Sequence, residues 1–136
     1  MPRQLEVIGG AERVSAEFIE HQKKLLELMK DLQIREVTMA RETIKSLGKN
    51  YLDEATRVTG NRSGRGSASI TLKNQVIVAE AMLSLKLLGL EQIDAALDAV
   101  LNGKYGDCRK CDIPVEEARL KAQPTALCHV KCESDC

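Results

Sequence analysis

The chain has 136 residues with 20 basic and 20 acidic side chains, so its formal net charge is zero. This length fits one domain, or one domain with a small metal-stabilised appendage. A neutral chain with no Trp, one Phe and two Tyr has no global attraction to nucleic acid and few aromatic platforms on which single-stranded bases could stack. The composition therefore does not favour direct nucleic-acid binding.

The first ten residues carry only a weak alternation of Leu5, Val7 and Ile8, which we interpret as a loose arm rather than a strand. No apolar segment of a signal peptide follows the initiating methionine, and no apolar run reaches transmembrane length. We therefore expect a cytoplasmic protein without a membrane span. Its cysteines would then be kept reduced, which favours metal binding over disulfides.

From residue 11 to residue 47, apolar side chains recur at three- and four-residue steps, which predicts a long amphipathic helix. The stripe consists of Val14, Phe18, Leu25, Leu28, Leu32, Val37, Ala40, Ile44 and Leu47. It slips between Leu32 and Val37, and Gly48 is placed to end the helix in a left-handed cap. Such a helix spans on the order of 50 Å, which is too long for a compact globule and favours a projecting hairpin.

Residues 48–70 are predicted to form the tip of that hairpin. Asn50 could cap a short helix over residues 51–58, with Asp53 in its first turn. Residues 60–67 are rich in Gly, Ser and Arg, which is the composition of a flexible loop. Basic side chains here could also hold phosphates electrostatically, but a solvated loop is the simpler interpretation.

A second long helix is predicted over residues 71–101, and Asn102-Gly103 is predicted to end it. The seam of this helix is formed by Val76, Ala79, Leu83, Leu90, Ile93, Leu97 and Val100. Lys86 interrupts the seam, whose alternating steps are typical of coiled coils. Two helices of similar length joined by a tip make an antiparallel, coiled-coil-like hairpin, so the predicted fold class is all-α.

The middle of the second helix, residues 76–90, is apolar on nearly all sides. It is broken only by Glu80, Ser84, Lys86 and Gly89. One hairpin partner can cover only a stripe of a helix, so the sequence predicts a further cover, either the N-terminal arm or another molecule. We favour self-association or a partner surface along this helix, where Gly89 would admit a second helix or mark a kink.

Cysteine and histidine residues gather in two close groups near the C-terminal end. Cys108 and Cys111 form the first group, and Cys128, His129 and Cys132 form the second. Paired ligands repeated across a short spacer have the layout of a tetrahedral zinc site. A filled four-ligand shell leaves no open position for chemistry, and the sequence carries none of the common phosphate-loop, dinucleotide or metalloprotease motifs. We therefore predict structural zinc and no enzymatic activity.

Two neighbouring residues, Cys128 and His129, are candidates for the third zinc ligand. Cys128 would complete a site of four thiolates with Cys108, Cys111 and Cys132, and we favour it because thiolates dominate structural zinc sites of this kind. His129 is the alternative, and either residue can share one face of a helical turn with Cys132. The terminal Cys136 is a weaker candidate.

The residues around these ligands resemble the DksA/TraR family of four-cysteine zinc-finger proteins. The resemblance rests on Gly103, Tyr105, Gly106, Cys108, Cys111, Arg119, Leu120, Ala122, Pro124, Thr125, Ala126 and Cys132, together with the run from Ile93 to Leu97. It is strongest over residues 93–132 and implies a zinc-finger module at 104–136 below a hairpin of residues 1–103. The usual family spacing, C-x2-C-x17-C-x2-C, would place the third ligand on His129.

The resemblance also implies a function. Similar proteins bind bacterial RNA polymerase and alter transcription initiation by inserting their helical hairpin into the secondary channel. Their tip carries an acidic D-x-x-D-x-A pattern, for which Asn50 to Ala55 is the closest match. The implied partner-binding residues are Asp53, Glu54 and Ala55, although Asn50 stands at the first acidic position and the tip is longer than in typical members. The alternative is a zinc-stapled protein-interaction module that does not enter the polymerase channel.

Overall fold

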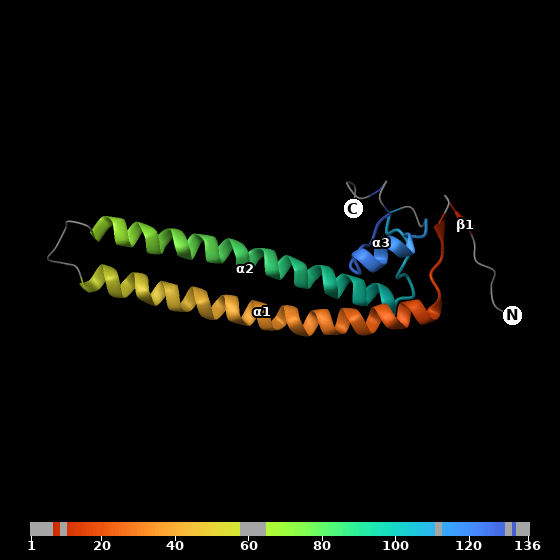
Figure 1. Cartoon of the computed structure of the whole chain (residues 1–136), viewed down its shortest axis with the longest axis horizontal. Coiled ribbons are helices and arrows are strands. Elements are labelled where there is room, and N and C mark those ends of the chain that lie inside the picture. Colours follow the sequence, from red (N-terminus) through yellow and green to blue (C-terminus); the bar gives the residue numbers. More distant parts are fainter. Residues whose placement is uncertain (1–6, 9–10, 58–64, 111–112, 130–131, 133–136) are drawn as a thin grey trace. The chain divides into compact units, whose positions relative to one another are not determined.

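The computed structural model describes residues 7–8, 11–57, 65–110, 113–129 and 132, and side chains are described from residue 13 to 53 and from 70 onward within these ranges. The element order is β1 (Val7–Ile8), β2 (Ala11–Glu12), α1 (Ala16–Arg57), α2 (Arg65–Leu101) and α3 (Glu117–Ala122) (Figure 1). Helix dominates, which confirms the all-α class. The chain divides into two compact units, one of Met1–Asp31 with Glu91–Cys136 and one of Leu32–Leu90.

The chain enters α1 differently from the prediction. β1 and β2 pair as a two-stranded antiparallel sheet, so the interpretation of the start as a loose arm is wrong for these residues, and so is a helix beginning at residue 11. α1 begins at Ala16, and the Ser15 hydroxyl oxygen accepts a hydrogen bond from the Phe18 N–H at 3.1 Å. This is the geometry of a helix N-cap, which satisfies a backbone donor that has no partner inside the helix.

The two long helices reach closer to the tip than predicted. α1 continues through Gly48 to Arg57, and α2 begins at Arg65. The predicted helix end at Gly48 and the separate short helix after it are therefore wrong. A glycine inside a helix costs only about 1 kcal/mol relative to alanine, which the flanking periodic turns outweigh. The interval between the helices is residues 58–64, which lie outside the described residues.

The buried face of α1 contains two glutamines, and these explain the slip in its apolar pattern. Leu28 and Leu32 were expected in the stripe, but their exposed fractions are 58% and 51%. The residues turned away from solvent are Gln22, Leu26, Met29, Gln33 and Val37, which follow three- and four-residue steps. Because two positions of this face carry polar side chains, a stripe read from apolar residues alone was displaced.

The predicted seam of α2 is confirmed, and the helix pairs with α1 in antiparallel fashion. All seven apolar seam residues are buried or partly buried: Val76, Ala79, Leu83, Leu90, Ile93, Leu97 and Val100. Lys30 of α1 forms an ion pair with Asp94 at 2.8 Å. Gln33 and Glu36, further along α1, instead contact Lys86, which lies earlier in α2. Contacts that advance along one helix and retreat along the other define an antiparallel hairpin.

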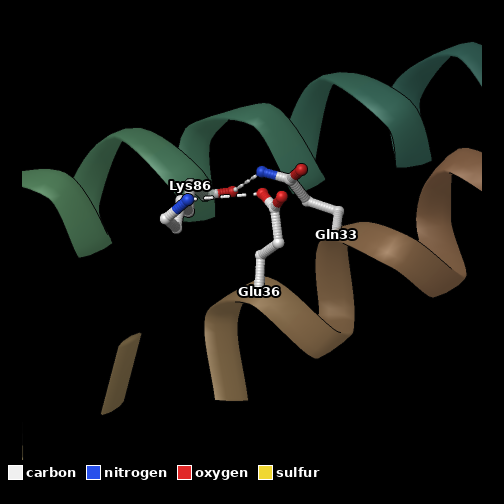
Figure 2. A network of polar contacts seen from close by, with 3 residues as sticks. All are labelled: Gln33, Glu36 and Lys86. Atoms are coloured by element: carbon white, nitrogen blue, oxygen red, sulfur yellow. Dashed lines mark hydrogen bonds and ion pairs between the residues drawn. The ribbon is translucent and has the colours of Figure 1, made fainter. Parts of the chain in front are cut away.

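Lys86, which interrupts the seam, belongs to a polar network between the helices (Figure 2). The Gln33 side-chain amide donates a hydrogen bond to the Lys86 carbonyl oxygen at 2.8 Å, and Lys86 Nζ lies 3.3 Å from Glu36 Oε2. Gly89 lies beside this network, because a Cβ atom added there would be 2.9 Å from Gln33 Nε2. The glycine therefore makes room for a side chain of the same hairpin, and not for a second helix.

The end of α2 at Gly103 is confirmed and has the hydrogen bonds of a Schellman motif. The Lys104 N–H donates to the Ala99 carbonyl at 2.8 Å, and the Gly103 N–H donates to the Val100 carbonyl at 3.2 Å. Gly103 has a φ of 69°, a left-handed conformation that glycine adopts without a Cβ penalty. This turn leads the chain from α2 into the segment that carries the cysteines.

One hydrophobic core joins the helices to that segment within the first unit. It consists of Leu26, Ile93, Ala96, Tyr105, Cys108, Val115, Leu120, Ala126 and Cys128. Residues on both sides of position 103 thus share one core, while the division into domains at 103 and 104 stays a prediction. Among the described residues, no membrane-spanning helix is found.

Candidate functional site

The first half of the candidate metal centre is a loop held by backbone hydrogen bonds. The Cys108 N–H donates to the Ile113 carbonyl at 2.8 Å, and the Arg109 N–H donates to the Leu127 carbonyl at 2.7 Å. The second of these bonds links the two cysteine groups directly. Cys108 itself is fully buried, so its sulfur is held in place by both the backbone and the core.

Gly106 shapes the approach to Cys108. Its φ of 90° lies in the left-handed region, and a Cβ atom there would be 3.0 Å from Val14 Cγ2. The Val115 N–H donates to the Gly106 carbonyl at 2.7 Å. The chain can therefore turn closely past Val14 only because this position has no side chain.

The second half of the centre is positioned by α3 and the turn after it. The spacer between the two cysteine groups contains α3, and Leu120 of α3 is fully buried in the same core as Cys108. The Arg119 Nε donates to the Cys128 carbonyl at 3.0 Å. The Cys132 N–H donates to the His129 carbonyl at 2.9 Å, and this turn brings the two side chains to the same place.

Three side chains converge on a common centre: Cys108, His129 and Cys132. Each offers one ligand atom, and these atoms lie within 4.8 Å of one another. His129 Nδ1 is 3.3 Å from Cys108 Sγ, and His129 Nε2 is 3.9 Å from Cys132 Sγ. Ligand bonds of 2.0–2.3 Å around tetrahedral zinc place neighbouring donor atoms about 3.5–3.8 Å apart. Because a histidine ligates a metal through one ring nitrogen, the fit rests on the grouping of one donor atom from each residue within 4.8 Å, which could hold a metal ion.

The remaining candidate ligands, Cys111, Cys128 and Cys136, are not part of this group of three. Cys111 and Cys136 lie outside the described residues. Cys128 is only 3% exposed and is disulfide-bonded in the structure, so ligation through its sulfur would require that bond to be reduced. His129, and not Cys128, is grouped with Cys108 and Cys132. The assignment of Cys128 as the third ligand stays a prediction beside this alternative.

A buried polar link, which apolar periodicity does not reveal, connects α1 to this segment. Gln22 is 2% exposed, and its side-chain amide donates to the Tyr105 hydroxyl at 3.2 Å and to the Leu120 carbonyl at 2.9 Å. The Tyr105 hydroxyl donates to the Pro124 carbonyl at 2.8 Å. Burial raises the pKa of Tyr105, and the hydrogen bond from Gln22 partly opposes that rise. The sequence feature that could have indicated this link is a single glutamine at a position where the helical spacing of α1 predicts a buried residue.

The predicted tip residues lie on α1. Asp53 is exposed, whereas Glu54 and Ala55 lie in the helix with side chains outside the described residues. Asn50 and Asp53 were interpreted as capping residues, and this is wrong because both lie inside α1. A carboxylate close to a helix C-terminus gains nothing from the helix dipole. The presence of Asp53 is therefore not explained by helix stability.

Comparison with known proteins supports the architecture. A solved structure, that of the transcription factor DksA2 from Pseudomonas aeruginosa, matches with a TM-score of 0.53 and 21% sequence identity, covering 90% of this chain and 88% of that chain. No protein-family model and no curated protein matches the chain. At this level of identity the likeness establishes a shared fold, namely the one found in DksA2.

Proposed function

We propose that this protein is a DksA-like transcription regulator that acts on bacterial RNA polymerase through the tip of its helical hairpin. The observation that carries the proposal is the fold shared with a transcription factor over nine-tenths of the chain. The hairpin is part of that shared fold, and the Cys/His group lies among the residues of this chain that resemble the DksA/TraR family. The proposed site of action is the bacterial cytoplasm, with the polymerase and not DNA as the direct partner.

Asp53 is the residue on which we place recognition. It is exposed, it lies in the last turns of α1, and it matches an acidic position of the family's tip pattern. An exposed carboxylate can accept charge-assisted hydrogen bonds from a partner. Glu54 and Ala55 complete the proposed contact by their place in the same pattern.

Zinc is proposed as a structural component of this regulator. The ion would be held by Cys108, His129 and Cys132, with Cys111 as the fourth ligand. When bound, it cross-links the two cysteine groups and stabilises the fold around them. The protein's own residues also stabilise the segment that carries the cysteines. The loop at Gly106, α3 and the Gln22–Tyr105 link hold it against α1 and α2.

Transcription by purified polymerase tests this proposal. Adding the protein to initiation reactions should change the yield from a responsive promoter, and Asp53→Asn should remove that effect without changing helicity or zinc content. An effect of equal size with the variant would overturn the role of Asp53. No effect of the native protein on any of a broad panel of promoters, together with no binding to polymerase, would leave the zinc-stapled protein-interaction module as the better account.

A further inference from the structure

The short segment before α1, residues 13–15 and called the entry segment here, lies against the turn that leads to Cys108. Arg13 Nη2 is 2.6 Å from Asp107 Oδ2, although the two residues are 94 positions apart in the sequence. A Cβ atom at Gly106 would be 3.0 Å from Val14 Cγ2. Two consecutive residues of the entry segment therefore approach two consecutive residues of the turn, and all four belong to the first compact unit.

The entry segment is held on both sides before it meets the turn. Arg13 directly follows β2, which pairs with β1, and Ser15 caps the first turn of α1. Val14 packs against the hydrophobic core that contains Cys108. Because a sheet and a helix start already restrict this segment, little further conformational entropy is lost when it contacts the turn.

The turn connects this contact to the candidate metal centre through the backbone. Asp107 forms an isolated antiparallel bridge with Pro114, so its position is fixed by more than the ion pair. The next residue, Cys108, is one of the three side chains that group together as candidate ligands. Asp107 and Cys108 share a planar peptide bond, so a displacement of one is passed to the backbone of the other.

Burial decides how strongly the ion pair can act. Hydrogen bonds between charged groups are roughly twice as strong as those between neutral groups. The Asp107 side chain is only 16% exposed, so water replaces a lost arginine poorly. The Arg13 side chain is 39% exposed, and solvent screening reduces its contribution. The pair should therefore have a moderate effect, larger than that of a fully exposed pair.

We infer that Arg13 is a positioning residue of the metal centre. Its ion pair with Asp107 docks the entry segment on the turn before Cys108, so that docking and zinc binding stabilise one another. The inference rests on the zinc centre proposed above and extends it to residues outside the Cys/His group. Coupling between two binding events is reciprocal. Loss of the ion pair should weaken zinc binding, and loss of zinc should loosen the entry segment.

Competition for zinc with a chromogenic chelator measures the first effect. Arg13→Gln should weaken zinc binding by about 10-fold, the lower end of the range for residues that orient metal ligands. Arg13→Lys keeps the charge and should recover part of the loss. Arg35→Gln is the matched control, because Arg35 is exposed on α1, and it should bind zinc as the native protein does. Circular dichroism checks that each variant keeps its helices.

A double-mutant cycle separates the ion pair from other roles of Arg13. In an Asp107→Asn background, Arg13→Gln should cause no further loss of zinc affinity, because the pair is already broken. Equal zinc affinity of the native protein and Arg13→Gln would overturn the inference and leave the zinc centre standing. A native protein that binds no zinc would overturn both.

Cleavage by trypsin after Arg13 measures the reverse effect, because the protease can take up this side chain only when it has left Asp107. The native protein saturated with zinc should be cleaved there more slowly than after zinc removal. Asp107→Asn saturated with zinc should be cleaved as fast as the metal-free native protein, whereas Asp31→Asn, the same change at an exposed position of α1, should be protected. Cleavage of the native protein at a rate independent of zinc would show that the entry segment and the metal centre are not coupled.

Discussion

At the scale of single residues, the candidate metal centre depends on which side chain would supply its third ligand. His129 contacts both Cys108 and Cys132, whereas Cys128 is held in the core with its carbonyl bonded to Arg119. The two residues are adjacent in the chain, yet the Cys128 side chain lies in the hydrophobic core and the His129 ring lies beside the other two candidate ligands. The grouping of one donor atom each from Cys108, His129 and Cys132 favours His129 over Cys128 as the third ligand.

We therefore expect His129→Ala to lose bound zinc and Cys128→Ala to retain it. Zinc binding to structural sites is worth on the order of 10–16 kcal/mol, so a site short of one ligand should release the ion to a chelator at concentrations that leave the native site filled. Metal analysis after chelator titration measures this difference. The reverse result, with zinc kept by His129→Ala and lost by Cys128→Ala, would identify the thiolate as the ligand.

Tyr105 provides a pH-dependent test of the buried link. Its pKa is raised above the ordinary value of 10.0 by burial. Because the folded-state pKa is the higher one, its contribution to stability is present below pH 10.0 and is lost as the pH rises through the folded-state pKa. In a Tyr51→Phe variant, where Tyr105 is the only tyrosine, the phenolate absorbance should therefore appear above pH 10.0. Gln22→Leu in the same background should move the transition further up, because it removes the hydrogen bond that opposes the rise.

How far single residues could be predicted from the sequence depended on their chemistry. The spacing of cysteines and histidine located the candidate centre, because metal ligands must be close in space and are often close in the chain. Spacing alone could not decide between Cys128 and His129, because the directions of two adjacent side chains depend on the conformation of the turn before Cys132. Gln22 was not predicted to be a core residue, because a glutamine breaks the apolar pattern that marks core positions.

At the scale of secondary-structure elements, the pairing of α1 with α2 includes a polar contact that fixes their register. The Gln33 amide donates to the Lys86 carbonyl (Figure 2), and it has room to do so because Gly89 carries no side chain. Polar side chains at a helical seam commonly specify register at some cost in stability. Gly89 and Gln33 are therefore expected to act as a pair.

A double-mutant cycle tests this coupling. Gly89→Ala alone should change the free energy of unfolding little, because the gain of about 1 kcal/mol in helix propensity is offset by a hydrogen bond worth about 0.5–1.5 kcal/mol. In a Gln33→Ala background the same substitution should stabilise the protein by about 1 kcal/mol, since no side chain then opposes the new Cβ. Urea unfolding at fixed zinc concentration gives the four values. Equal effects of Gly89→Ala in both backgrounds would show that the two residues are independent.

The helices themselves were largely predictable, and their ends were less so. Periodicity identified two long helices and the seam of α2, and Asn102-Gly103 marked the end of α2 through a cap that needs glycine. Gly48 gave the same signal at a place where the helix continues, because one residue of low helix propensity cannot end a helix whose neighbouring turns are favourable. Ser15 marked the true start of α1, but the apolar stripe extended past it.

At the scale of the whole molecule, the chain combines a hairpin fold shared with a transcription factor, a Cys/His group and an exposed acidic residue in the last turns of α1. Each unit is held by contacts of its own: the Gln33–Lys86 network in one, and the core around Cys108 and Leu120 in the other. The fold class could be predicted from the sequence because both helices are long and periodic. The partner could be proposed only through resemblance, because an exposed carboxylate does not by itself specify what it binds.

The most direct measurement is the equilibrium affinity of the protein for bacterial core RNA polymerase, compared among the native chain, Asp53→Asn and Asp31→Asn. Asp31 is a suitable control because it is also exposed on α1 and undergoes the same chemical change. Hydrogen bonds to charged groups are worth about 1.5–3 kcal/mol, so Asp53→Asn should weaken binding by about 10-fold or more, with Asp31→Asn close to native. Absence of binding by the native protein, or equal affinity of all three with zinc content unchanged, would contradict the proposed action through the tip.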